Sequence, residues 1–258
     1  MKLFLKKQNK ELVLKPTTFP DGDSYCYIED IESFQDEDVV ISARAYSKQN
    51  ERLSELYLVL DLIKDYAQSI TLVIPYMPYS RQFASFETIC SILSSLGANE
   101  LYTLDSHYLK GKPEATIRGL KIHNFVIKDE LLSNIAGEYD LISPDEGASY
   151  LGNQSFIKTR DNNKQVSSMS LGTVKLSKEH CVIIDDMIST GTTMIKAINN
   201  VKQLGVDKVS CVVTHGLFLN NSHKEISELT HQIICSDSVS KGIINSEKYL
   251  LTKLTKGD

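Results

Sequence analysis

Short runs of β-branched residues alternate with amphipathic stretches along the chain, and this alternation limits the possible folds more than any other feature. The apolar runs are expected as strands at 39–43, 70–77, 100–105, 122–127, 140–143, 156–159, 181–185, 208–214, 232–235 and 249–254. Helical spacing of apolar residues predicts helices at 50–67, 86–96, 192–204 and 224–229. Strands that alternate with helices are typical of βαβ units, so the sequence predicts an α/β fold with mainly parallel sheets flanked by helices.

The alternation occurs in two series, which indicates two lobes. A length of 258 residues fits one large domain or two of ordinary size. No low-complexity segment separates the series, and the change between them falls within residues 131–138. We therefore expect an N-terminal lobe at residues 1–133 and a C-terminal lobe at residues 134–258.

Composition excludes several classes of function. The net charge of −5 argues against a dedicated nucleic-acid binder, which normally carries a basic excess. Charges interrupt the first fifteen residues, and no uncharged run reaches the roughly 18 apolar residues of a membrane helix. The five cysteines are far apart and form no CxxC pair, as in reduced proteins without a zinc cluster. These features predict a cytoplasmic protein that binds neither nucleic acid nor a membrane.

The segment Val182–Thr193, VIIDDMISTGTT, carries the most specific pattern in the chain. Ligands of open parallel sheets bind at the carboxyl ends of strands, and here a strand runs into two carboxylates, a Ser/Thr/Gly loop and a helix. Free N–H groups at a helix start, together with hydroxyls, can surround a phosphate, while the carboxylates can hold sugar hydroxyls or position a divalent cation. The alternative is an acidic strand end with an ordinary N-cap. The loop is not a Walker A sequence, because GxxxxGK[ST] is absent.

Five further segments stand at strand ends or turns. They are FPDGD at 19–23, IPYMPYSRQ at 74–82, LDSH at 104–107, SPDEGA at 143–148 and VTHGLF at 213–218. Together with DDMISTGTT, and in this order, they resemble the motifs of the ribose-phosphate pyrophosphokinase (PRPP synthetase) family, in a short form that lacks the C-terminal helical segment. The resemblance implies two phosphoribosyltransferase-like lobes.

The same resemblance implies a reaction: transfer of the diphosphoryl group of ATP to O1 of ribose 5-phosphate, giving 5-phosphoribosyl 1-diphosphate (PRPP) and AMP. The residues that match the family's site are Lys158, Arg160 and His107 for catalysis; Phe19, Asp21, Asp23, Arg81 and Gln82 for ATP; Asp185, Asp186, Ser189, Thr190, Gly191, Thr192 and Thr193 for ribose 5-phosphate; and His107 and Asp145 for Mg²⁺. In the family the loop at 19–23 comes from a neighbouring subunit, so a homo-oligomer is expected.

Some of these residues also have purely structural interpretations. Asp145 suits an Asx-turn, and Lys158 and Arg160 suit an exposed strand edge. The polar segment 161–168 that follows them lacks apolar anchors and is expected to act as a lid.

Four positions depart from the family pattern, the first being Asp23, which stands where the family usually has Glu. Phe83 follows the Arg-Gln pair where an acidic residue is common, and Ser189 and Thr192 stand where Asp and Gly are more usual. Two alternative functions therefore stay open: a phosphoribosyltransferase that consumes PRPP, and an inactive regulatory relative. Incubation with ATP and ribose 5-phosphate distinguishes the implied reaction from both alternatives, because neither alternative releases AMP.

Overall fold

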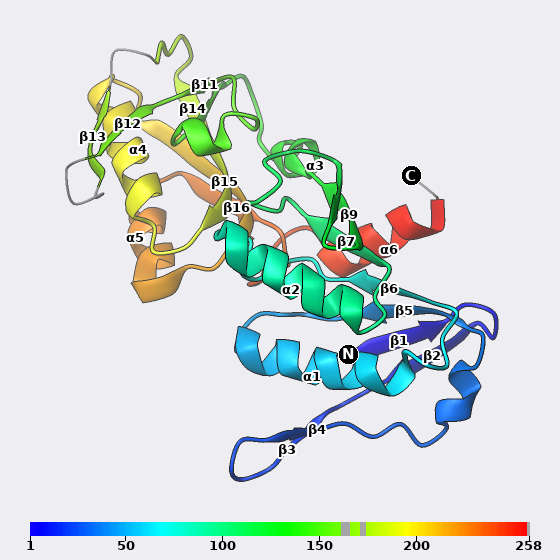
Figure 1. Cartoon of the computed structure of the whole chain (residues 1–258). Helices are drawn as coiled ribbons and strands as arrows, with labels where there is room; N and C mark the ends of the chain where they lie inside the picture. The colour runs from blue at the N-terminus through cyan, green and yellow to red at the C-terminus, as the bar shows by residue number, and fades with distance from the viewer. Residues whose placement is uncertain (161–165, 171–173, 257–258) are drawn as a thin grey trace. The chain divides into compact units, whose positions relative to one another are not determined.

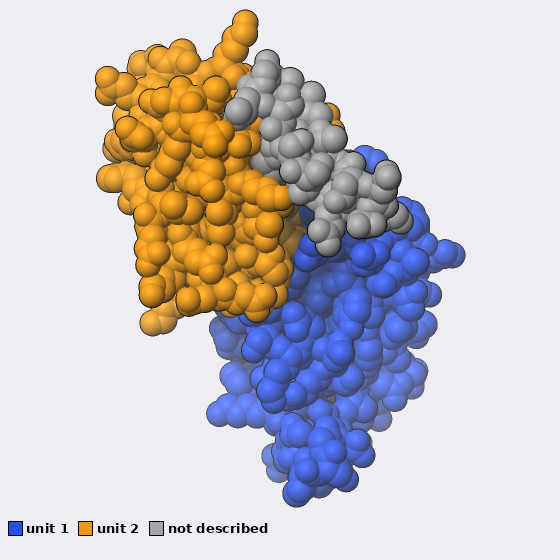
Figure 2. All heavy atoms as spheres, turned by 90° about the vertical axis from the view of Figure 1, so that its left-hand side faces the viewer, with its two compact units in different colours: residues 1–126, 246–258 blue, residues 127–245 orange. Residues whose placement is uncertain are grey.

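The computed structural model describes residues 1–160, 166–170 and 174–256, with residues 157–160 and 166–170 as backbone only. Contacts divide the chain into two compact units, coloured separately in Figure 2: unit 1 is Met1–Val126 with Ser246–Asp258, and unit 2 is Ile127–Asn245. The sequence predicts a division between residues 133 and 134. The boundary between the units lies earlier, between Val126 and Ile127, because α3 (Lys128–Leu132) packs against β15 (Lys208–Gly216) of unit 2.

Unit 1 contains a seven-stranded sheet in the order β2-β1-β5-β6-β7-β9-β8 (Figure 1). Its strands are β1 Lys2–Leu5, β2 Lys10–Val13, β5 Asp38–Ser42, β6 Ser69–Val73, β7 Glu100–Leu104, β8 Glu114–Ile117 and β9 Leu120–Phe125. The four central strands β5, β6, β7 and β9 run parallel, whereas β1, β2 and β8 join the edges antiparallel. A small hairpin, β3 (Thr17–Thr18) and β4 (Ser24–Tyr25), and a 3₁₀ turn, η1 (Ile31–Phe34), precede β5.

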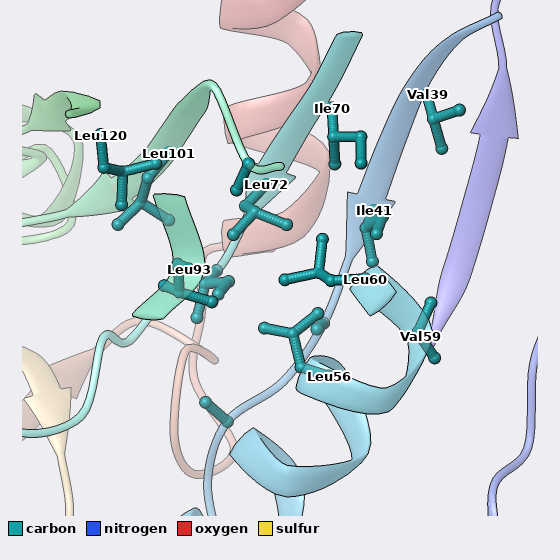
Figure 3. Close-up of a cluster of buried hydrophobic side chains, with 14 of the residues drawn as sticks. Val39, Ile41, Leu56, Val59, Leu60, Ile70, Leu72, Leu93, Leu101 and Leu120 are labelled. Carbon is teal, nitrogen blue, oxygen red and sulfur yellow. The ribbon is translucent and has the colours of Figure 1, made fainter. Parts of the chain in front are cut away.

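Helices cover both faces of this sheet. One face packs against α1 (Gln49–Ile63) and α2 (Phe83–Ser95), and the other against α6 (Ser246–Lys256). Figure 3 shows Leu56 and Leu60 of α1 directed at Ile41 and Leu72 of the sheet; all four side chains are buried. Burial on both faces explains why the central strands are almost continuously apolar.

Unit 2 contains a five-stranded parallel sheet in the order β11-β10-β14-β15-β16. Its elements are α3, β10 Asp140–Ser143, η2 Glu146–Ala148, β11 Gln154–Ser155, β14 His180–Ile188, α4 Thr192–Gln203, β15, η4 Leu219–Asn221, α5 Ser222–Leu229 and β16 Gln232–Cys235, with a separate two-stranded ribbon of β12 Ile157–Arg160 and β13 Val166–Ser170. Its core joins Ile183 and Val213 of the sheet to Ile198 of α4 and Ile226 of α5.

The predicted fold class is confirmed: both sheets are mainly parallel and flanked by helices. One predicted element is wrong, because residues 249–254 lie in helix α6 and not in a last strand. The apolar residues of this segment recur at helical spacing, with Leu250 fully buried against the unit 1 sheet. The antiparallel strands β1, β2 and β8 were not predicted, since each has only four residues and begins with a charged one.

No helix in the described part of the chain is long and apolar enough to span a membrane. All five cysteines are buried and unpaired.

Burial of the cysteines leads to a prediction about thiol reactivity. Burial raises the pKa of the Cys90 and Cys181 thiols to about 12, and only the thiolate reacts rapidly with disulfide reagents. We expect the native protein to react slowly with 5,5′-dithiobis(2-nitrobenzoate) and to release five equivalents of thionitrobenzoate once it is unfolded in guanidinium chloride. A thiol that reacts at the rate of free cysteine in the native protein would contradict this expectation.

Candidate active site

The phosphate-binding candidate of unit 2 lies between β14 and α4. The sequence predicts that the strand ends at Asp185. In the structure β14 continues through Ile188, because Met187 and Ile188 pair with His215 and Gly216 of β15. The two carboxylates therefore lie within the strand, and only Ser189–Gly191 connect it to the helix. The predicted helix start at Thr192 is confirmed.

Gly191 is required at this turn for two reasons. Its φ of +79° lies in the left-handed region, where residues with a Cβ are strained. A Cβ at this position would also lie 2.8 Å from Cβ of Ser222 and 3.3 Å from Cδ1 of Ile226. The chain thus passes close to α5 before it enters α4.

The first turn of α4 offers its backbone N–H groups at this point. Among the described residues no side chain caps this turn, and Gly191 is its N-cap. The Thr190 and Thr192 hydroxyls lie 3.3 Å apart and both residues are exposed, while Thr193 is half-buried. Unpaired N–H groups and hydroxyls at a helix start are suited to an anion.

Residues of the VTHGLF segment, of η4 and of α5 hold the turn in place. The backbone N–H of Leu219 donates to the Ser189 carbonyl at 2.9 Å, and the Ser222 hydroxyl donates to the same oxygen at 3.2 Å. The N–H of Leu217 donates to the Ile188 carbonyl at 2.9 Å. The hydrogen bonds of Leu219 and Ser222 to Ser189 could not be predicted from the sequence, since no local pattern connects residues thirty positions apart.

The two neighbouring carboxylates have different surroundings. Successive residues of a strand point to opposite faces of the sheet. Asp185 is half-buried and its Oδ1 accepts a hydrogen bond from the N–H of Asp186 at 2.9 Å, whereas Asp186 itself is only 3% exposed. Asp185 is thus the more accessible of the pair.

Asp145 follows β10, the strand that lies beside β14 in the sheet. Its Oδ1 accepts a hydrogen bond from the N–H of Gly147 at 2.7 Å and caps the 3₁₀ turn at 146–148. This contact is the Asx-turn that the sequence analysis gave as the structural interpretation. Asp145 therefore follows β10, and Asp185 and Asp186 lie in the neighbouring strand β14. All three stand toward the carboxyl ends of the parallel strands of the unit 2 sheet.

In unit 1 the structure brings together the segments that carry Arg81, Gln82 and His107. These segments follow β6 and β7, which are parallel neighbours, and the N–H of Leu104 donates to the Pro75 carbonyl at 3.1 Å. Arg81 and Gln82 are exposed immediately before α2, and His107 is half-buried after β7. Ser106, next to His107, is buried and its hydroxyl has no partner among the described residues.

The loop with Phe19, Asp21 and Asp23 forms the exposed turn of the β3–β4 hairpin. The Asp21 carboxylate accepts from the Asp23 N–H at 3.1 Å, and the Phe19 ring packs on Tyr25 at 6.1 Å. Figure 1 shows this hairpin projecting from unit 1 beyond α1, on the far side from α2. Within one chain the structure does not bring it to Arg81 and Gln82.

The backbone of Lys158 and Arg160 lies in β12, where Lys158 pairs with Met169 and Arg160 with Val166. Their side chains lie outside the described residues, as does most of the segment 161–168 that was expected to act as a lid. Residues 166–168 of that segment belong to strand β13.

A metal site made by the protein alone does not occur in the part of the chain that the structure describes, since no three His, Cys, Asp or Glu side chains gather there. His107 belongs to unit 1 and Asp145 to unit 2. Mg²⁺ usually keeps several waters and is held by one or two carboxylates together with substrate phosphates. The carboxylates at the edge of the unit 2 sheet fit that mode of binding.

Comparisons with known proteins agree with these features. Residues 6–104 match the N-terminal domain of ribose phosphate pyrophosphokinase, and residues 147–248 match the phosphoribosyl transferase domain. The ribose-phosphate pyrophosphokinase of Saccharolobus solfataricus is 30% identical over 238 residues, which cover 82% of this chain and 79% of that protein. That of Pyrococcus furiosus is 29% identical over 245 residues, covering 86% and 84%.

Among solved structures, phosphoribosylpyrophosphate synthetase from Mycobacterium smegmatis superimposes with a TM-score of 0.74 at 20% identity and covers 95% of this chain and 91% of that one. The fold thus consists of two phosphoribosyltransferase-like domains. The protein is a diphosphokinase-type transferase of nucleotide biosynthesis. It belongs to the ribose-phosphate pyrophosphokinase family, as its motifs predicted.

Proposed function

We propose that this enzyme transfers the diphosphoryl group of ATP to O1 of ribose 5-phosphate and forms PRPP and AMP. The observation that carries the proposal is the turn Ser189–Thr193, which joins the acidic end of β14 to an uncapped helix start. Membership of the family supports the general reaction. In the proposed step the bond between the α- and β-phosphates of ATP breaks, O1 binds the β-phosphorus, and the O1 proton is released.

Ribose 5-phosphate would bind in unit 2. The helix N–H groups and the hydroxyls of Ser189, Thr190, Thr192 and Thr193 would hold its 5-phosphate, with Gly191 allowing the close approach of the backbone. Asp185 and Asp186 would hold the ribose hydroxyls. Catalysis would then consist mainly of aligning O1 with the β-phosphorus of ATP and neutralising charge on the transferred group.

ATP would bind through Arg81 and Gln82, since the planar guanidinium suits phosphate oxygens. Phe19, Asp21 and Asp23 would come from a neighbouring copy, because the hairpin projects beyond α1, on the far side from α2, the helix that Arg81 and Gln82 precede. Mg²⁺ would neutralise phosphate charge, with Asp145 and His107 as its protein contacts. Lys158 and Arg160 would contact the β- and γ-phosphates. We accordingly propose a homo-oligomer that works in the cytoplasm.

Release of AMP tests the proposal. Purified enzyme with ATP, Mg²⁺ and ribose 5-phosphate should produce AMP and PRPP in equal amounts. The match of residues 147–248 to the phosphoribosyl transferase domain favours one second candidate, an enzyme that consumes PRPP. That enzyme would leave ATP unchanged and would instead release pyrophosphate from PRPP and a base. Absence of AMP under all metal conditions would refute the proposed reaction.

Thr193→Val tests the phosphate turn, because it keeps the shape of the side chain and removes its hydroxyl. Loss of a hydrogen bond to a charged group typically costs about 1.5–3 kcal/mol, or roughly 10- to 150-fold in affinity. Calorimetry should show ribose 5-phosphate binding weakened to that extent and ATP binding little changed. Thr230→Val is a matched control, since the Thr230 hydroxyl donates to the Ile226 carbonyl at 2.8 Å within α5. Equal sugar affinity in both variants would remove Thr193 from the site.

A further inference from the structure

Three aromatic rings in unit 1, tilted against one another, pack in a row that leads from the core to the surface. The Phe86 ring is fully buried and lies 4.9 Å from the Tyr108 ring, at an interplanar angle of 33°. The Tyr108 ring lies 4.9 Å from the Phe83 ring at 38°. Phe83 is 63% exposed, so the outer ring of the stack is presented to solvent.

The position of the outer ring is well defined. Phe83 is the first residue of α2 and Phe86 lies in the same turn, with its N–H bonded to the Gln82 carbonyl at 2.9 Å. The Tyr108 ring is held from behind by the fully buried Phe86 ring. Tyr108 in turn supports the Phe83 ring from the side that faces the core.

This aromatic surface lies between the segment that the proposed function assigns to ATP and the segment of His107, which it assigns to Mg²⁺. Phe83 directly follows Arg81 and Gln82 at the end of the β6 loop, and its partner Tyr108 directly follows His107 after β7. An aromatic face next to an exposed guanidinium matches a ligand that has a flat ring system at one end and anionic phosphates at the other. Nucleoside triphosphates have this combination.

We propose that Phe83 stacks on the adenine ring of ATP and thereby contributes to nucleotide affinity, an inference that rests on the proposed function. Stacking of a base on an aromatic side chain is worth about 5- to 150-fold in affinity, judged from alanine substitutions in proteins that bind single strands. Phe83 is then a binding residue and not a catalytic one, so its loss should raise the KM for ATP and leave kcat almost unchanged.

The first test is spectroscopic and does not depend on turnover. The chain contains no tryptophan, so Phe83→Trp introduces a single reporter. ATP should quench its fluorescence in a saturable manner, whereas tripolyphosphate, which has no base, should not. Leu204→Trp is the control, because it places a single reporter at the C-terminal end of α4 in unit 2. Leu204 is 39% exposed, and ATP should cause no change in fluorescence at this position. Absence of quenching by ATP in the Phe83→Trp enzyme would overturn the proposal.

The second test compares two replacements of similar size in the enzyme without tryptophan. Phe83→Leu keeps an apolar side chain but has no aromatic face, and should raise the KM for ATP roughly 5- to 100-fold. Phe83→Tyr keeps the ring and should stay close to wild type. Inhibition by tripolyphosphate should be the same in all three proteins. An unchanged KM in Phe83→Leu, or a loss shared by Phe83→Tyr, would refute the stacking role.

The outcomes separate this inference from the proposed function. ATP-dependent quenching without formation of AMP would support the stack and refute the reaction. Formation of AMP with neither quenching nor a change of KM would support the reaction and refute the stack. Fluorescence that changes with protein concentration and not with ATP would place Phe83 in an interface between copies, which also overturns the proposal.

Discussion

Gly191→Ala is expected to lower kcat/KM for ribose 5-phosphate by about 10²-fold, the loss that follows when a binding group is displaced by about 1 Å. The new Cβ would lie 2.8 Å from Cβ of Ser222, which itself donates to the Ser189 carbonyl. Relief of this contact requires the turn to shift away from α5. The shift would misalign the turn with the N–H groups of the first turn of α4. Steady-state kinetics with ribose 5-phosphate as the varied substrate measures the effect.

Gly205→Ala provides a matched control at the other end of the same helix. Gly205 has a φ of +90°, close to the +79° of Gly191, so alanine is strained at both positions by about 1–2 kcal/mol. A Cβ at Gly205 would meet nothing within 4 Å. Thermal unfolding should show a loss of stability in both variants, while only Gly191→Ala loses activity. Equal activity of the two variants would contradict the assignment of the turn.

Lys158→Ala and Arg160→Ala are each expected to slow turnover by roughly 10²-fold or more, the usual effect of losing a group that stabilises transition-state charge. The expectation rests on the match of these residues to the family's catalytic strand. A cation that acts mainly in the transition state lowers the barrier without tightening ground-state binding, so the KM values for ATP and ribose 5-phosphate should change far less.

Lys178→Ala serves as the control for removal of another lysine of unit 2. Its ammonium pairs with Glu138 at 2.5 Å on an exposed surface, and its loss should leave turnover unchanged. Near-normal turnover in both Lys158→Ala and Arg160→Ala would favour the interpretation of an exposed strand edge. A large loss of ATP affinity at unchanged kcat would make the two residues binding groups instead.

Much of the fold could be predicted from local patterns. The central strands were predicted because burial on both faces leaves a continuous apolar run, and the helices α1 and α4 because burial of one face leaves apolar residues at helical spacing. The end of α4 is an example: Gly205 follows Leu204 with a positive φ, as its position after the last apolar residue indicated.

The edges of unit 1 could not be predicted in the same way. The strand β1 is only four residues long, begins with a lysine and is followed by another, yet Leu3 and Leu5 are fully buried because β1 pairs with β5. The segment 249–254 was taken for a strand, and it is a helix because Leu250 packs on a sheet whose strands lie far away in the sequence. The residues of a short segment do not reveal the distant strands against which that segment packs.

The candidate site shows the same division. Local sequence was enough to predict that one buried strand carries two carboxylates and leads into a glycine turn and a helix start, because those residues are neighbours in the chain. Three features become visible only in the folded chain: the strand continues to Ile188, the Ser222 hydroxyl donates to the Ser189 carbonyl, and the rings of Phe83, Tyr108 and Phe86 pack together. These features depend on strand pairing and side-chain packing between distant segments, and such contacts exist only once the sheet has placed those segments side by side.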